Sequence, residues 1–304
     1  MALKLIKNKI RATQRTGKVT KAMEAVSAVK MRKSQERALS GRAYARAALR
    51  ILARLSATGA GKEHPFAKVQ SGDRALYIVI TSDKGLAGNV NSAVLKMLEA
   101  EVRGVDKGKV SFITFGRKAT DYLTNRGYTV IKSYLNVSDE VSLADMQEVV
   151  ALAAGAFTAH ECDKVSIIYQ NFLSTFEQKP SVHELLPLRE ETLRTIVKGI
   201  RPARGKFADE GEEGKAVLNY TVEPDPEEII ALLVPQLLEI MVYHALLESK
   251  ASEHSARMVA MKNATEKAKE MTKSLTIKFN KERQAVITRE VSEITGGIEA
   301  MAQK

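Results

Sequence analysis

One glycine-rich stretch, VITSDKGLAGNVN at residues 79–91, has the residue types for phosphate chemistry. It follows an apolar run and precedes a helix-forming one, a setting in which backbone N–H groups can face a phosphate. Its spacing matches neither GxGxxG nor GxxxxGK[ST], and no acidic residue follows about 20 residues later at the end of a second strand. We therefore predict a structural turn built on Asp83 and Gly85. A nucleotide-binding enzyme that uses residues 82–89 is an alternative.

The histidines and the one cysteine show no spacing typical of a metal or catalytic site. The five histidines are His64, His160, His183, His244 and His254. They form no HxxxH pair, and no Ser, His and acid set stands out. Cys162 cannot form an internal disulfide, which indicates a buried, inert thiol in a reducing compartment. The sequence thus predicts no catalytic, metal-binding or cofactor-binding residue, and a protein that is not an enzyme.

The middle of the chain has the alternation of an α/β domain. Runs rich in β-branched and aromatic residues lie at 74–81, 109–116, 128–135 and 164–172. Helical patterns lie between them at 90–102, 117–125 and 143–158. This order predicts a mainly parallel, Rossmann-like sheet in a domain spanning residues 74–222. We expect a further edge strand at 175–188 and a charged, glycine-punctuated excursion at 189–222.

The N-terminal segment, residues 1–58, has the pattern of one long helix. No proline occurs from Leu3 to Ser56. A heptad-like stripe follows spacings of three and four residues through Leu3, Ile6, Ile10, Thr13, Gly17 and Thr20. A helix of this length is too long to lie within an ordinary globular domain.

The C-terminal segment, residues 225–301, predicts a second long helix. Asp225 is a suitable N-cap, Pro226 fits the first helical position and Glu228 fits a capping box. An apolar stripe continues through Met258, Met261, Ala264, Ala268, Met271 and Leu275. The middle domain cannot bury two such helices, so we predict that they pair with each other as an antiparallel coiled coil.

The positive charge of the chain is concentrated at its N-terminus. Residues 1–60 contain 15 Lys and Arg against two acidic residues, whereas the remainder is close to neutral. Such a segment favours an acidic partner. An acidic protein surface is one candidate. A coiled-coil scaffold that binds nucleic acid through this basic helix is the alternative, although only Tyr44 interrupts the run and nucleic-acid binders tend to interleave aromatic residues.

Four stretches resemble one known family. They are GKVTKAMEAVSAVKMRKSQ at 17–35, TSDKGLAGNVN at 81–91, SEHSARMVAMKNAT at 252–265 and FNKERQAVITREVSEITGG at 279–297. Their sequence and order are similar to those of the γ subunit of F-type ATP synthases. The resemblance implies the central rotor stalk, which couples ion translocation through a c-ring to ATP synthesis or hydrolysis on the β subunits. It implies as partners a hexameric ring of α and β subunits, the ε subunit and the c-ring, and no nucleic acid.

The resemblance also assigns roles to individual residues, by matching motifs. It places at β subunits the residues Met23, Arg257, Arg283, Gln284, Thr288 and Glu290. It places Tyr220 and Glu223 on the side of the c-ring and ε. The helix tip beyond Val291 is implied to turn in an apolar sleeve.

The expected location is peripheral, on the cytoplasmic face of an energy-transducing inner or plasma membrane. The N-terminus lacks the apolar region of a secretory signal. The most apolar window, residues 229–247, contains Pro235, Glu239 and His244, so we expect a core helix and no transmembrane segment. The absence of a cysteine pair in 198–219 predicts a bacterial type without the redox insert of chloroplast versions.

Overall fold

The computed structural model describes residues 2–40, 64–188 and 226–302 of the chain. These residues form two units. The helical unit comprises residues 1–27 and 257–304, and the α/β unit comprises residues 28–256. Two long helices, α1 (Ala2–Ser40) and α7 (Pro226–Ala302), contribute residues to both units.

The α/β unit contains a five-stranded sheet in the order β3-β2-β1-β4-β5. Its strands are β1 (Ala75–Ile80), β2 (Val110–Phe115), β3 (Thr129–Tyr134), β4 (Lys164–Phe172) and β5 (Gln178–Leu186). The first four are parallel and β5 is antiparallel to β4. The predicted parallel, Rossmann-like sheet is confirmed, and the expected edge strand is β5.

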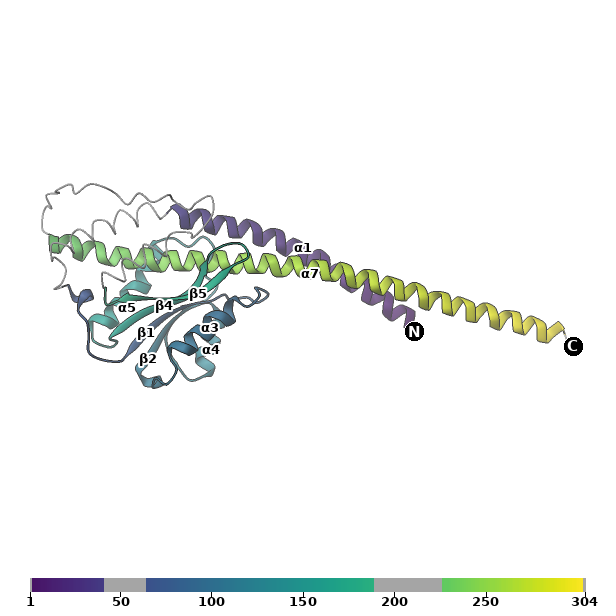
Figure 1. Ribbon diagram of the computed structural model, residues 1–304, viewed down its shortest axis with the longest axis horizontal. Helices are drawn as coiled ribbons and strands as arrows, with labels where there is room; N and C mark the ends of the chain where they lie inside the picture. The colour runs from purple at the N-terminus through teal and green to yellow at the C-terminus, as the bar shows by residue number, and fades with distance from the viewer. Residues whose placement is uncertain (1, 41–63, 189–225, 303–304) are drawn as a thin grey trace. The chain divides into compact units, whose positions relative to one another are not determined.

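The helices of this unit cover both faces of the sheet (Figure 1). They are α3 (Val90–Glu101), α4 (Arg117–Asn125), α5 (Gln147–Thr158) and the first part of α7, with 3₁₀ turns at Pro65–Ala67, Lys107–Lys109 and Ala144–Met146. α3 and α4 pack on one face, while α5 and α7 pack on the other. Strand β1 shows why both faces need cover, since Ile78 and Ile80 point to one apolar cluster and Tyr77 and Val79 to the other.

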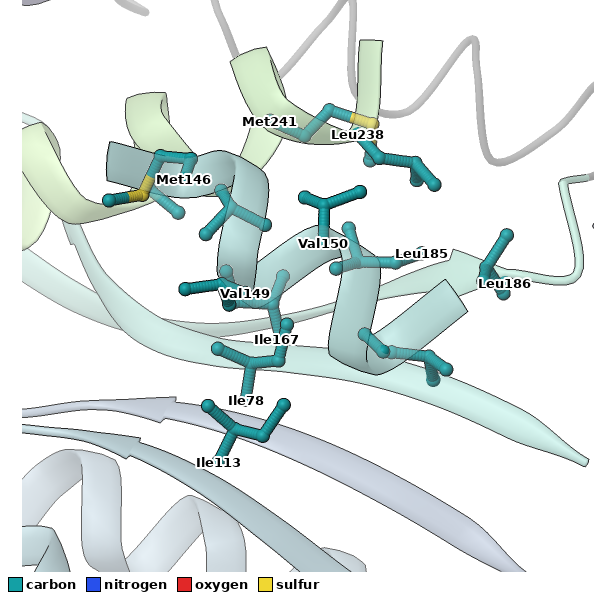
Figure 2. Packing of buried hydrophobic residues seen from close by; sticks show 14 of the residues in the cluster. Ile78, Ile113, Met146, Val149, Val150, Ile167, Leu185, Leu186, Leu238 and Met241 are labelled. Carbon is teal, nitrogen blue, oxygen red and sulfur yellow. The ribbon is translucent and has the colours of Figure 1, made fainter. Parts of the chain in front are cut away.

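The larger apolar cluster joins the sheet to α5 and α7. In Figure 2, Ile78 and Ile113 of the sheet lie below Val149 of α5, with Leu238 and Met241 of α7 above. α7 is apolar on several sides here because its residues Val234–Leu246 contribute to the core. By length and composition α7 is also long and apolar enough to cross a membrane, but 61% of its apolar window is buried within the chain, as expected of a core helix.

The helical unit is an antiparallel pair. Gly17 faces Ala268, and the hydroxyls of Thr20 and Thr265 are 2.7 Å apart. Residue numbers therefore rise along α1 while they fall along α7, so the predicted antiparallel pairing is confirmed for the described residues.

The contact stripe of α1 follows the predicted heptad. Its less exposed positions are Leu3, Ile6, Ile10, Thr13, Gly17 and Thr20, as expected. In α7 the prediction was partly wrong, because Met271 is 52% exposed and the threonines Thr265 and Thr272 are the less exposed residues at this level. The two helices lie close together here, since a β-carbon on Gly17 would be 3.3 Å from that of Ala268.

Several predictions concern residues that lie outside the described ranges. These are the continuation of the first helix to residue 58, the excursion at 189–222 and the cap at Asp225. Within the described residues, α1 ends at Ser40 and α7 begins at Pro226.

Candidate partner-binding surfaces

The tip of α7 extends beyond the start of α1. The Gly17–Ala268 and Thr20–Thr265 pairs fix the register, which places Ala2 of α1 opposite residue 283. Beyond that point α7 continues to Ala302, which is roughly 30 Å of helix at about 1.5 Å per residue. Every residue from 283 to 298 is exposed. The register of the pair thus explains why this end has no partner on α1.

An apolar stripe follows this exposed tip. It consists of Ile287, Val291, Ile294, Ile298 and Met301. Their spacings of four and three residues keep them on one face of the helix, and their side chains are between 50% and 83% exposed. Such a stripe normally packs against something. We call these five residues the tip stripe.

Polar residues predicted to contact β subunits flank the tip stripe on both sides. At 100° per residue, Arg283 and Glu290 project along one border, and Gln284 and Thr288 along the other. All four are exposed. An apolar centre with a polar border is the usual composition of a protein–protein interface. The structure therefore brings these four predicted residues together on one surface.

Arg257 differs from the other predicted contacts because it is only 8% exposed. Burying a guanidinium requires compensating interactions within the protein, and Arg257 has such an interaction. Its contact with a β subunit stays a prediction.

Met23 lies in a small apolar patch on α1. It is half-buried, and Val19 and Val26 lie four residues before it and three after it, with more than half of each side chain exposed. The spacing of both valines from Met23 is a signal that the sequence carries. Seven cations of α1, from Lys4 to Lys21, are exposed and form no ion pair within the described residues. The exposed side of α1 therefore combines a small apolar patch with strong positive charge.

Tyr220 and Glu223, predicted to face the c-ring and ε, lie outside the described residues. Their placement stays a prediction.

The glycine-rich turn of residues 79–91 has a structural role. The two carboxylate oxygens of Asp83 accept hydrogen bonds from the backbone N–H groups of Arg117 and Asn136, each at 3.0 Å. Asp83 thereby ties the loop after β1 to the start of α4 and the end of β3. The amide of Asn91 braces the same loop through Ser82, from which its Oδ1 accepts a backbone hydrogen bond of 2.9 Å. A carboxylate at the N-terminus of α4 occupies the position that favours an anion, as expected for a structural turn.

A cavity of about 240 Å³ lies between the C-terminal ends of α3 and α4. The Arg126 guanidinium stacks 3.7 Å from the centre of the Tyr122 ring, and Lys107 Nζ donates to the Arg126 carbonyl at 2.7 Å. Burial, assisted by a hydrogen bond to Glu99, raises the pKa of Tyr122 to about 12. Cations stabilise the partial negative charge at helix C-termini, which accounts for their presence here.

The other candidates for chemistry are buried or dispersed. Cys162 is buried, and burial raises the pKa of its thiol to about 11, so it is protonated at neutral pH as predicted for an inert cysteine. Among the described residues, no three His, Cys, Asp or Glu side chains come together in a way that could hold a metal ion.

Comparison with known proteins identifies the family. The sequence model of the ATP synthase family matches residues 2–301. The ATP synthase gamma chain of Pelotomaculum thermopropionicum is 37% identical over 300 residues, which are 99% of each chain. That of Heliobacterium modesticaldum is 36% identical over 297 residues, 97% of this chain and 98% of the relative. The chain belongs to the ATP synthase gamma chain family. The family resemblance noted in the sequence is confirmed.

Solved structures with the fold of this family are also similar. A Euglena gracilis mitochondrial ATP synthase chain has a TM-score of 0.64 at 18% identity, covering 99% of this chain and 94% of its own length. A central stalk and c-ring structure from Tetrahymena thermophila mitochondrial ATP synthase contains a chain with a TM-score of 0.59 at 24% identity, covering 81% and 99%. At these identities the likeness concerns the fold, and it agrees with the predicted combination of long helices and a Rossmann-like sheet.

Proposed function

We propose that this gamma-family chain is the rotor shaft of an F-type ATP synthase, coupling ion translocation through the c-ring to ATP synthesis or hydrolysis on the β subunits. It acts as a non-catalytic subunit. The observation that carries the proposal is the tip of α7, which extends past α1 and exposes an apolar stripe at heptad spacing. A helix of that kind needs an external partner.

The tip stripe suits a sleeve in which it turns. Apolar contact is non-directional, so rotation against an apolar wall breaks no specific hydrogen bonds. Arg283 and Gln284 offer directional donors at the base of the tip, where they would contact loops of β subunits, with Thr288 and Glu290 beside them. The two kinds of surface correspond to turning at the tip and gripping at its base.

The basic face of α1 suits an acidic surface on a β subunit. Its exposed cations would attract acidic loops as they pass, and the patch of Val19, Met23 and Val26 would supply apolar contact without fixed geometry. Met23→Lys is then expected to impair coupling, because a new cation would pair with those acids and resist sliding.

The further partners are the α subunits of the ring, ε and the c-ring, with Tyr220 and Glu223 on the c-ring side. The protein would be peripheral on the cytoplasmic face of a bacterial inner or plasma membrane. Neither the family nor the related structures support the alternative of a nucleic-acid-binding scaffold.

Co-purification tests this function. A tagged copy expressed in its own cells is expected to co-purify with α, β and ε subunits in fixed stoichiometry. The variant in which Ile294 and Ile298 are both replaced by Asp is expected to lose these subunits. Recovery of the chain alone, or binding to random duplex DNA that falls steeply with salt, would refute the proposal. Within the complex, Gln284→Ala is expected to slow ATP turnover without loss of assembly, and normal turnover would remove the gripping role.

A further inference from the structure

The loop after β3 carries an acidic side chain that contacts both long helices within the α/β unit. Asp139 Oδ2 is 2.7 Å from Lys30 Nζ of α1. Asp139 Oδ1 is 3.1 Å from His254 Nε2 and 3.4 Å from Lys250 Nζ, both on α7. One carboxylate thus links three segments far apart in the sequence. We call Asp139, Lys30, Lys250 and His254 the Asp139 cluster.

Backbone contacts reinforce the same loop. Arg37 of α1 donates to the Asp139 carbonyl, and its other terminal nitrogen is 3.6 Å from Glu140. Lys250 Nζ donates to the Val137 carbonyl at 2.8 Å. Lys30 and Arg37 lie seven residues apart and share a face of α1, just as Lys250 and His254 share a face of α7. The loop is therefore held from two helices at several points.

Burial makes the Asp139 cluster stronger than an ordinary surface ion pair. The side chains of Lys250 and His254 are 10% and 6% exposed, and that of Asp139 is 30% exposed. The hydrogen bond with His254 holds the pKa of Asp139 well below its usual range against the opposing effect of burial, and Lys30 adds to it. Charge-assisted hydrogen bonds in such a setting are strong and have fixed geometry.

Among the described residues, the neighbouring part of α1 packs mainly through small side chains. Its buried residues here are Ser27, Met31, Ser34 and Ala38, mostly small. Small side chains bury little apolar area, and apolar contact resists separation more than it resists sliding. Among the described contacts, directional bonds are thus the main resistance of this stretch to twisting.

We infer that Asp139 is a positioning residue that locks α1 and α7 to the sheet against twisting, so that torque passes between the helices and the α/β unit. This inference rests on the proposed rotor function for its consequence, but its structural part concerns the isolated chain. It predicts that loss of the carboxylate loosens α1 without disturbing the sheet.

The first test uses backbone hydrogen exchange in the isolated full-length chain. Asp139→Asn keeps the shape of the side chain and removes its charge. Amides of residues 31–38 are expected to exchange on the order of tenfold faster than in the wild type, while those of β1 and β2 do not change. Asp145→Asn is the matched control, since Asp145 lies in the same loop region and binds only Ser142 among the described residues. Unchanged exchange at 31–38 would overturn the inference.

The second test uses the complete ATP synthase in inverted membrane vesicles. A potential-sensitive dye reports ATP-driven pumping of either ion, while phosphate release reports hydrolysis. Asp139→Asn is expected to retain hydrolysis but to lose ions pumped per ATP as the opposing gradient rises. A role in stability alone would lower the amount of complex and leave that ratio unchanged, which would overturn the torque role.

Two further variants keep the outcome interpretable. Lys30→Gln removes only the α1 side of the cluster from a half-exposed position, so it should fold and show a smaller loss of coupling. Asp139→Glu should restore part of the coupling. If exchange changes as expected but the chain fails to co-purify with ATP synthase subunits, the rotor proposal fails and the locking role stands.

Discussion

The sheet of the α/β unit and the tip of α7 use the same residue types for opposite purposes. Ile78 and Ile113 of the sheet are completely buried, whereas Ile294 and Ile298 of the tip are each 63% exposed. In the sheet these side chains stabilise the fold of the chain itself. At the tip they add almost nothing to that fold, so their value lies in contact with another protein.

The sharpest test of this comparison makes the same substitution, isoleucine to alanine, once in the sheet and once at the tip. Ile78→Ala is expected to lower the free energy of unfolding by about 3–4 kcal/mol, because it leaves a cavity in the packed core. Ile294→Ala should change it by less than about 0.5 kcal/mol. Urea unfolding of the isolated chain measures both. Equal losses would mean that the tip packs within the chain after all.

The next effect concerns the stabilisation by Asp139 and its loss at low pH. The pKa of Asp139 is lower in the folded chain than its ordinary value of about 4, so the unfolded chain takes up the proton first as pH falls. The stabilisation is therefore present above about pH 4 and lost below it. At neutral pH, Asp139→Asn is expected to lower the free energy of the local opening of residues 31–38 by about 1.4 kcal/mol, which corresponds to the tenfold change in their exchange. Hydrogen exchange of these amides over a range of pH, corrected for the intrinsic exchange rate, should show this difference shrinking in acid, whereas a difference independent of pH would contradict the assignment.

The close approach of α1 and α7 in the helical unit predicts a similar cost for a large residue. Gly17→Leu is expected to destabilise the pair by about 2 kcal/mol, because even a β-carbon at Gly17 would lie 3.3 Å from that of Ala268. Gly155→Ala is the control, because Gly155 is an exposed helical position with open space and should gain about 0.5–1 kcal/mol. Thermal melting followed by circular dichroism compares the two. A neutral Gly17→Leu would show that the helices are further apart.

The smallest predicted effect concerns the hydrogen bond between the hydroxyls of Thr20 and Thr265. Thr20→Val alone is expected to cost about 1 kcal/mol, because Thr265 loses a buried partner at 2.7 Å. The double change to valine at Thr20 and Thr265 should cost less than the sum of the single changes. A double-mutant cycle of unfolding free energies measures the difference. Strict additivity would indicate that the hydroxyls do not interact in solution.

Sequence patterns predicted the sheet well and the helix contact less well. Strands such as β1 are recognisable because both of their faces are apolar, and that pattern does not depend on a distant partner. The contact face of α7 was harder, because Met271 is the more apolar residue and yet Thr272 is less exposed. Which of two adjacent residues faces inward depends on where the other helix lies, and that helix, with Gly17 close to Ala268, is about 250 residues away in the chain.

For the partner-binding surfaces too, the sequence predicted some features and only the structure showed others. Motifs named Arg283, Gln284, Thr288 and Glu290 individually, but only the helix register showed that they border an exposed apolar stripe beyond the end of α1. Arg257 belonged to the same predicted set, and its burial separates it from them.

The sequence by itself determined the two long helices, the parallel sheet between them and the family, because periodicity, strand composition and long motifs are local properties of the chain. Only the tertiary structure decided which side chains are left for partners and how α1 and α7 are fastened to the sheet. Asp139 illustrates the reason, since its three side-chain partners come from residues 30, 250 and 254. Interactions between such distant residues depend on where folding places them, and no local pattern records that.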